Sequence, residues 1–148
     1  MRLADRILVQ LTTTFEGNAW HGTPLRKMLD SVDDVTANAR PIPNARTIAE
    51  LTAHVTAWIE ISDRRARGEQ FEVTSEMDFP NVQRVAWSEI VERLERAHAA
   101  LIETVRSMSD SEIDSSPPGK SYTNEFMLHG VAHHNTYHAA QIAMLKKF

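Results

Sequence analysis

The C-terminal stretch TNEFMLHGVAHHNTYHAAQIAMLKKF, residues 123–148, has the pattern of one long helix and limits which fold the chain can adopt. It contains no proline, and Thr123 or Asn124 stands where an N-cap residue is expected. Each helical residue turns about 100° around the axis. On that spacing His134 shares an apolar face with Met127, Val131, His138, Gln141 and Leu145. The two histidines of this face therefore point toward the interior.

His134 and His138 form the first candidate site. Histidines four residues apart lie one turn above each other and can face one ion. The alternative is a pair of core histidines that each find a hydrogen-bond partner. A divalent ion needs only one nitrogen from each ring, so the pair favours half of a metal site. HxxxH alone is a weak motif, and Asn135 stands where HExxH enzymes have their glutamate. His129 and His133 fall on other faces and are expected at the surface.

A third ligand has to come from another helix, and periodicity leaves two candidates. His54 lies at the edge of an apolar stripe on one predicted helix, and His98 lies close in phase to Leu101 and Val105 on another. Either histidine by itself would be interpreted as a core residue with a hydrogen-bond partner. The residue pattern does not choose between them.

The composition limits the class of protein. The 148 residues fit a single domain, 1–148, large enough for its own core. There is no cysteine, so a metal would need nitrogen and oxygen ligands. The 16 basic and 20 acidic residues give a net charge of −4 without a basic cluster, which argues against nucleic acid as a partner. No secretory signal pattern and no apolar run of about 18 residues is present, so we expect a cytoplasmic protein that binds no membrane.

The remaining helices follow from apolar spacing. Long helices are predicted from Leu3 to about Phe15, from Thr47 to about Gly68 and from Trp87 to about Met108, and a short one from Thr23 to about Ser31. Thr47 and Glu50 form a capping box at the start of the second long helix. Loops are predicted for residues 33–46 and 109–121, and no conformation is predicted for the polar connection 69–84. The sequence therefore predicts an all-α fold, a four-helix bundle with one short additional helix.

Four further residues have two interpretations each. Trp20 is interpreted as a loop aromatic that seals one end of the bundle and His21 as a surface residue, and the alternative places them at the mouth of a pocket. Tyr137 is interpreted as a packing aromatic rather than a proton donor. Gln141 either orients a ligand or hydrogen-bonds to a helix.

Three arginines, Arg64, Arg65 and Arg67, lie near the end of the helix that begins at Thr47. The C-terminal end of a helix carries a partial negative charge that favours cations. We therefore interpret these arginines as complementing the helix dipole and do not expect a phosphate site.

Three segments resemble the DinB/YfiT-like superfamily of metal-dependent proteins. They are NTYHAAQI after His134, LTAHVTAW around His54, and AWHGTPLRKML near the N-terminus. The resemblance implies a four-helix bundle, often homodimeric, in which the second helix supplies one histidine and the last helix two. Its metal ligands would be His54, His134 and His138, often holding nickel or zinc, and His98 would be a core or boundary histidine. Ala139-Ala140 replaces the Arg-Gly of the superfamily, which changes the pocket shape but not the ligands.

The resemblance also suggests a function. A site with three histidines keeps coordination positions open, as catalytic metal sites do. Some superfamily members are transferases in which the metal holds a low-molecular-weight thiol for attack on an electrophile, and the absence of protein cysteine is compatible with a thiol cosubstrate. The competing interpretations are a non-catalytic metal-binding stress-response module and a metal-dependent hydrolase.

Overall fold

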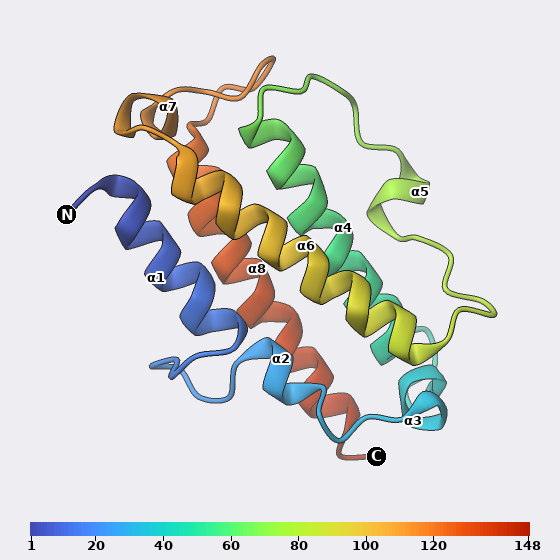
Figure 1. Cartoon of the computed structure of the whole chain (residues 1–148). Helices are drawn as coiled ribbons and strands as arrows, with labels where there is room; N and C mark the ends of the chain where they lie inside the picture. The colour runs from blue at the N-terminus through green and yellow to red at the C-terminus, as the bar shows by residue number, and fades with distance from the viewer.

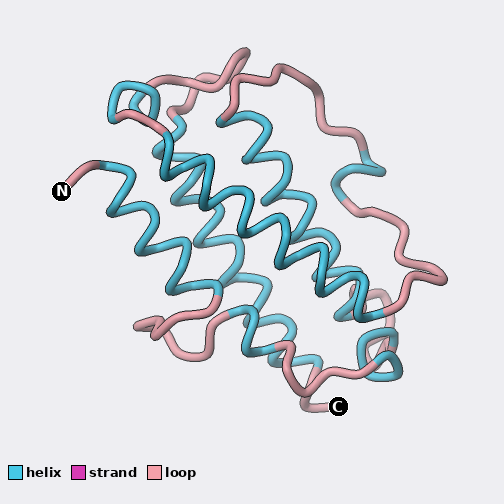
Figure 2. The backbone as a smooth tube through the Cα atoms, in the orientation of Figure 1, coloured by secondary structure: helices cyan, strands magenta, loops and turns pink.

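The computed structural model describes residues 1–148 as an assembly of helices without a β-sheet (Figures 1 and 2). Its four long helices are α1 (Leu3–Phe15), α4 (Ile48–Ala66), α6 (Trp87–Ser107) and α8 (Asn124–Leu145). Its four short helices are α2 (Leu25–Met28), α3 (Asp34–Asn38), α5 (Ser75–Asp78) and α7 (Asp110–Asp114). The predicted all-α bundle is confirmed. None of the helices is both long and apolar enough to cross a membrane.

The long helices form a bundle in which each packs against two others. α1 lies beside α6 and α8, and α4 lies beside the same two helices. In Figure 1, α1 and α8 run in one direction and α4 and α6 in the other. Because α4 and α6 are parallel, the chain between them returns along the outside of the bundle and carries α5 with it (Figure 1).

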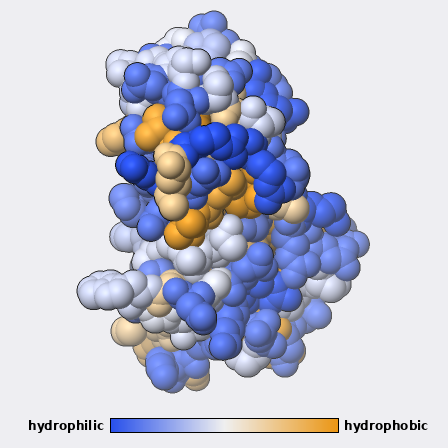
Figure 3. Space-filling view, turned by 60° about the vertical axis from the view of Figure 1, so that its left-hand side comes forward, coloured by the Kyte–Doolittle hydropathy of each residue, from blue (hydrophilic) through white to orange (hydrophobic).

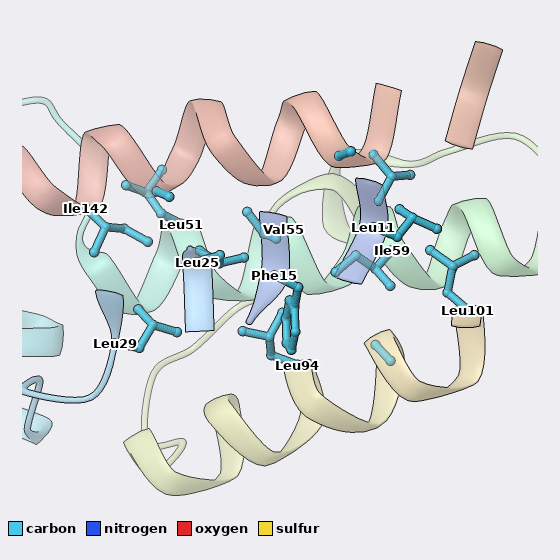
Figure 4. Close-up of a cluster of buried hydrophobic side chains, with 14 of the residues drawn as sticks. Leu11, Phe15, Leu25, Leu29, Leu51, Val55, Ile59, Leu94, Leu101 and Ile142 are labelled. Atoms are coloured by element: carbon cyan, nitrogen blue, oxygen red, sulfur yellow. The ribbon is translucent and has the colours of Figure 1, made fainter. Parts of the chain in front are cut away.

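The core fills the space between the four long helices. A cluster of 27 buried apolar residues includes side chains from all of them, among them Leu11, Val55, Leu94 and Ile142 (Figure 4). Burying one such side chain stabilises the fold by about 1.5–3 kcal/mol. Hydrophilic side chains cover most of the face seen in Figure 3, and they surround a hydrophobic patch.

Local signals fix both ends of α4, the helix that contains His54. Thr47 and Glu50 form the predicted capping box: the Thr47 hydroxyl accepts from the Glu50 amide at 3.1 Å, and the Glu50 carboxylate accepts from the Thr47 amide at 2.8 Å. At the other end Gly68 adopts a φ of 89°, and the amides of Gly68 and Glu69 donate to the carbonyls of Arg65 and Arg64. This pattern is a Schellman motif, in which glycine takes the left-handed conformation without a steric cost.

Two predicted loops and one connection without a predicted conformation contain short helices. The expected loops 33–46 and 109–121 contain α3 and α7, and the connection 69–84 contains α5, so the bundle has four short helices rather than one. Each of these three begins at a residue whose side chain accepts a hydrogen bond from a backbone amide of the first turn: Asp33, Thr74 and Ser109. A satisfied N-cap stabilises even a single helical turn once it packs against a bundle.

The N-terminal loop also departs from expectation. Trp20 is completely exposed to solvent and does not seal the end of the bundle. The neighbouring His21 is exposed, as the sequence predicts. The loop turns back on itself through an isolated bridge between Ala19 and Gly22, which directs these side chains outward.

His98 is a core histidine, as the sequence predicts. It is 5% exposed, its ring stacks on Phe15 with centroids 3.7 Å apart, and its Nδ1 has no hydrogen-bond partner. Burial disfavours the charged ring and lowers the pKa of His98 from 6.5 to about 4.

This burial predicts a loss of stability in acid. The unfolded chain takes up a proton on His98 near its ordinary pKa of 6.5, but the folded chain does so only near 4. The contribution is therefore complete above about pH 6.5 and decreases as the pH falls toward 4. The test is urea unfolding of the metal-free protein at pH 7.5 and at pH 5.0. Between these two pH values the free energy of unfolding should fall by about 2 kcal/mol more in the wild type than in His98→Phe, which keeps an aromatic ring stacked on Phe15. An equal loss in both proteins would contradict this prediction.

Candidate metal centre

The packing of α4 against α8 brings three histidines together. His54 lies on α4, and His134 and His138 lie one turn apart on α8. The Nε2 atom of His134 is 3.1 Å from that of His54 and 3.1 Å from that of His138. The three residues form a group whose ring nitrogens lie close enough together to hold one metal ion.

The spacing of these nitrogens agrees with metal coordination. Imidazole nitrogens bind zinc at about 2.0–2.1 Å, so neighbouring nitrogens in an octahedral or tetrahedral shell lie about 2.8–3.4 Å apart. The two distances of 3.1 Å fall in this range. The backbone and the rotamers therefore place Nε2 of His134 at a ligand spacing from both neighbours, and all three donor atoms lie within 4.8 Å of one another.

The outer nitrogens of two rings are engaged by hydrogen bonds. Nδ1 of His54 donates to the backbone carbonyl of Asp78 at 2.7 Å, and Nδ1 of His138 donates to the side-chain oxygen of Gln141 at 2.6 Å. A neutral imidazole that donates from Nδ1 carries a lone pair on Nε2. Both rings thus present a lone pair to the common centre, the arrangement that orients histidine ligands in metal proteins. Gln141 thus hydrogen-bonds to His138 on its own helix.

The three rings cannot satisfy one another by hydrogen bonds alone. His134 lies between His54 and His138, and a neutral ring has at most one hydrogen on Nε2. That hydrogen can be donated to only one of two neighbours that both offer lone pairs. A cation at the centre accepts all three lone pairs at once. The donor set therefore fits a metal ion.

The surroundings of His134 and His138 favour the neutral form of these two rings. Burial, followed by the proximity of His138 and His54, lowers the pKa of His134 to about 4. Burial is also the main cause that lowers the pKa of His138. Because only neutral imidazole binds a metal, a depressed pKa reduces competition from protons near neutral pH.

Aromatic side chains hold the rings in place from the outside. Phe79 stacks on His54 with centroids 4.1 Å apart, and Tyr137 meets His138 edge to face at 4.9 Å. Trp58 donates from its indole nitrogen to Oδ1 of Asp78 at 2.7 Å, which fixes the residue whose carbonyl supports His54. The interpretation of Tyr137 as a packing aromatic agrees with this contact, although the residue is 63% exposed.

A pocket of about 380 Å³ opens directly onto the histidines. Its walls come from α4, from α8, from the end of α5 and from the chain just before α8. They comprise His54, Trp58, Ser62, Arg65, Asp78, Tyr122, Met127, Gly130, Val131 and His134. A small molecule can therefore approach His54 and His134 from the pocket, whereas His138 does not line it.

Other polar residues singled out in the sequence lie elsewhere. His133 is exposed and His129 half-buried, and neither joins the group of three histidines. Asn135 is fully buried in the bundle, so the position of the zincin glutamate faces away from solvent.

The sequence interpretation missed several residues of the pocket, among them Asp78, Arg65 and Tyr122. Asp78 belongs to a connection for which no conformation was predicted. Arg65 was grouped with Arg64 and Arg67, which do form ion pairs at the helix end, but it is buried and lines the pocket. The position of Arg65 along the helix could have indicated its role. Arg65 follows His54 by eleven residues, which is about three helical turns, so both residues lie on one face of α4.

Comparison with known proteins gives one informative result. No curated protein and no solved structure matches the chain significantly. A sequence profile described as the DinB superfamily matches residues 19–142, a span that includes all three histidines and all four short helices. With most of its length covered by that match, the chain belongs to the DinB superfamily.

Proposed function

We propose that His54, His134 and His138 bind one divalent metal ion through their Nε2 atoms. The observation that carries this proposal is that Nε2 of His134 lies 3.1 Å from Nε2 of both His54 and His138, while the opposite nitrogens of His54 and His138 are held by hydrogen bonds. Such outer hydrogen bonds fix the tautomer and the orientation of a ligand histidine.

The ligand chemistry supports nickel or zinc as the metal. Imidazole nitrogen suits zinc, nickel, copper and iron, whereas magnesium and calcium prefer oxygen. The chain has no cysteine that would favour a softer, thiolate-rich site. Three neutral ligands also leave the full double positive charge of the ion available to an anionic ligand.

We propose that the pocket serves catalysis, in which a low-molecular-weight thiol is transferred to an electrophile. When bound, the divalent ion supplies Lewis acidity that lowers the pKa of a thiol and holds it as a nucleophile. The side chains of Trp58, Met127 and Val131 supply an apolar wall that shields the sulfur from water. Asp78 places a carboxylate on the same pocket and can accept the thiol proton. The sulfur then bonds to the electrophilic carbon, and the leaving group departs with its electron pair.

Asp78 also favours a second candidate, a metal-dependent hydrolase. A carboxylate beside a metal site can accept a proton from water as well as from a thiol. Assays of the metal-loaded protein with thiol and electrophile pairs, and with ester and amide substrates, separate the two reactions. A non-catalytic metal-binding module would turn over neither class.

The first prediction concerns the ligand set. Wild-type protein purified without a histidine tag should bind about one zinc or nickel ion per chain. His54→Ala should weaken binding at least ten-fold, about 1.4 kcal/mol, because one of three protein ligands is lost. His98→Ala is the matched control and should stay within a few-fold of wild type. If isothermal titration shows loss of binding in His98→Ala but not in His54→Ala, the proposed ligand set is wrong.

The second prediction concerns access to the ion. Because the pocket reaches His54 and His134, a small thiol should enter the coordination shell of cobalt-substituted protein. Titration with 2-mercaptoethanol should produce a sulfur-to-metal charge-transfer band. A spectrum that stays unchanged at millimolar thiol would point to a closed structural site and would remove the basis for thiol transfer.

We also propose that the protein forms a homodimer through α8. Phe126, Tyr137 and Met144 follow one another at spacings of eleven and seven residues, which places them on one face of the helix. Each is more than 60% exposed, and exposed apolar patches of this kind commonly mark interfaces.

Light scattering after size exclusion tests the dimer. The wild type should have twice the mass of one chain, and Met144→Glu should shift the equilibrium toward the monomer because it places a charge in the contact. Val9→Glu, at an exposed apolar position on α1, should leave the mass unchanged. A monomeric wild type at 100 µM would exclude a stable dimer.

A further inference from the structure

Arg65 is a buried arginine without a carboxylate partner. It is 7% exposed, and its one hydrogen bond is from Nη1 to the hydroxyl of Tyr122 at 3.1 Å. Its Nε is shielded from solvent and has no partner. Buried arginines are almost always paired, because an uncompensated charge in the interior is costly. A ligand that supplies a negative charge would remove this cost.

The neighbouring acidic residues form ion pairs with other arginines and not with Arg65. Arg64 binds Glu69 at 2.7 Å, and Arg67 binds Asp63 at 2.9 Å. Both of these pairs lie at the end of α4. Arg65, on the pocket side of the same helix turn, forms no salt bridge. The charges at this helix end are thus paired except for the one that lines the pocket.

The free edge of Arg65 has the geometry that carboxylates recognise. Arg93 shows the arrangement in the same protein: its Nε and Nη2 donate to the two oxygens of Glu60 at 2.9 and 2.7 Å. Arg65 uses Nη1 for Tyr122 and leaves the equivalent edge, Nε and Nη2, without an acceptor. A carboxylate matches this edge, and because Nε is shielded from solvent, one that enters the pocket reaches the edge first at Nη2.

Tyr122 adds a second donor at the same end. Its hydroxyl oxygen accepts from Arg65, so its own hydrogen is free to be donated to an anion. The rings of Trp58 and Phe71 lie 5.9 and 5.6 Å from the guanidinium carbon and limit its movement.

Arg65 and the histidines occupy opposite ends of one pocket. Arg65 follows His54 by eleven residues on α4, which is about 16 Å along the helix axis on nearly the same face. Helical side chains lean toward the N-terminus, so the guanidinium extends toward His54. Both residues line the same space of about 380 Å³.

We propose that Arg65 and Tyr122 bind the carboxylate of a small molecule whose other end reaches the three histidines. The inference rests on the proposed function and deepens it, because it assigns a chemical class to the molecule. Asp78 lies at the histidine end of the pocket, where its carboxylate repels another, so the charges set the orientation: carboxylate at Arg65, reactive group at His54 and His134.

The main test compares paired thiols on cobalt-loaded protein. The probes are ω-mercaptocarboxylates of three to eight carbons and the matching ω-mercaptoalcohols, with affinities from the sulfur-to-metal band and from calorimetry. At the chain length that spans the pocket, the wild type should bind the carboxylate at least ten-fold more tightly than the alcohol. Arg65→Met should abolish this preference and leave affinity for the alcohol within two-fold.

Three variants serve as controls. Arg96→Met removes a charge from an exposed arginine on α6 and should keep the full preference. Arg65→Lys should keep part of the preference for the carboxylate, because lysine retains the positive charge but lacks the planar guanidinium with its paired donors. Tyr122→Phe should reduce it several-fold, and this variant tests the site even if Arg65→Met fails to fold, which thermal melts will reveal. A preference that survives Arg65→Met overturns the proposal.

A second arm identifies which reactant carries the carboxylate. Hexanoate is titrated into zinc-loaded protein saturated with 2-mercaptoethanol. Binding that requires Arg65 assigns the carboxylate to the electrophile. Exclusion of hexanoate, together with a preference for mercaptocarboxylates, assigns it to the thiol. If neither hexanoate nor any mercaptocarboxylate gains affinity from Arg65, the proposal is wrong.

Metal-free protein separates this inference from the proposed function. Hexanoate binding to the metal-free wild type that is lost in Arg65→Met would support the carboxylate site even if the histidines bind no metal. Conversely, a sulfur-to-metal band without carboxylate preference would leave thiol access intact and reject the role of Arg65.

Discussion

The contact between α4 and α8 is the constraint on which the candidate site depends. His54 on one helix and His134 and His138 on the other meet only because these helices pack directly, over the same apolar residues that form the core. Close packing fixes the side-chain spacing across a packed helix pair. The stability of the bundle and the placement of the nitrogens therefore have a common origin.

One side of helix α4 packs into the hydrophobic core, and another side faces the pocket. Val55 and Ile59 are fully buried in the core, whereas His54 and Trp58, each one position earlier, face the pocket. The connection that carries α5 covers this second side, where Phe79 stacks on His54. The helix is thus enclosed on most of its circumference, and its histidine is shielded from water although the bundle has only one core.

Much of this arrangement could be predicted from local patterns, and the failures have physical causes. The spacing of apolar residues and the capping residues predicted the four long helices. The four-residue spacing of His134 and His138 predicted that one ring lies one turn above the other. Helix α7 was missed although Ser109 and Glu112 form a capping box, because five residues are too few to show an apolar period. The carbonyl of Asp78 could not be foreseen, because a main-chain acceptor in a connection leaves no trace in residue type.

The two histidine supports differ in how they tolerate evolutionary drift. Gln141 holds His138 with its side chain, so most replacements at that position remove the hydrogen bond at once. Asp78 holds His54 with a main-chain carbonyl, which every amino acid possesses. That hydrogen bond tolerates substitution but is sensitive to an insertion or deletion in the connection, which would move the carbonyl. The hydrogen bond to His54 therefore constrains the number of residues between α4 and α6 but not which amino acids they are.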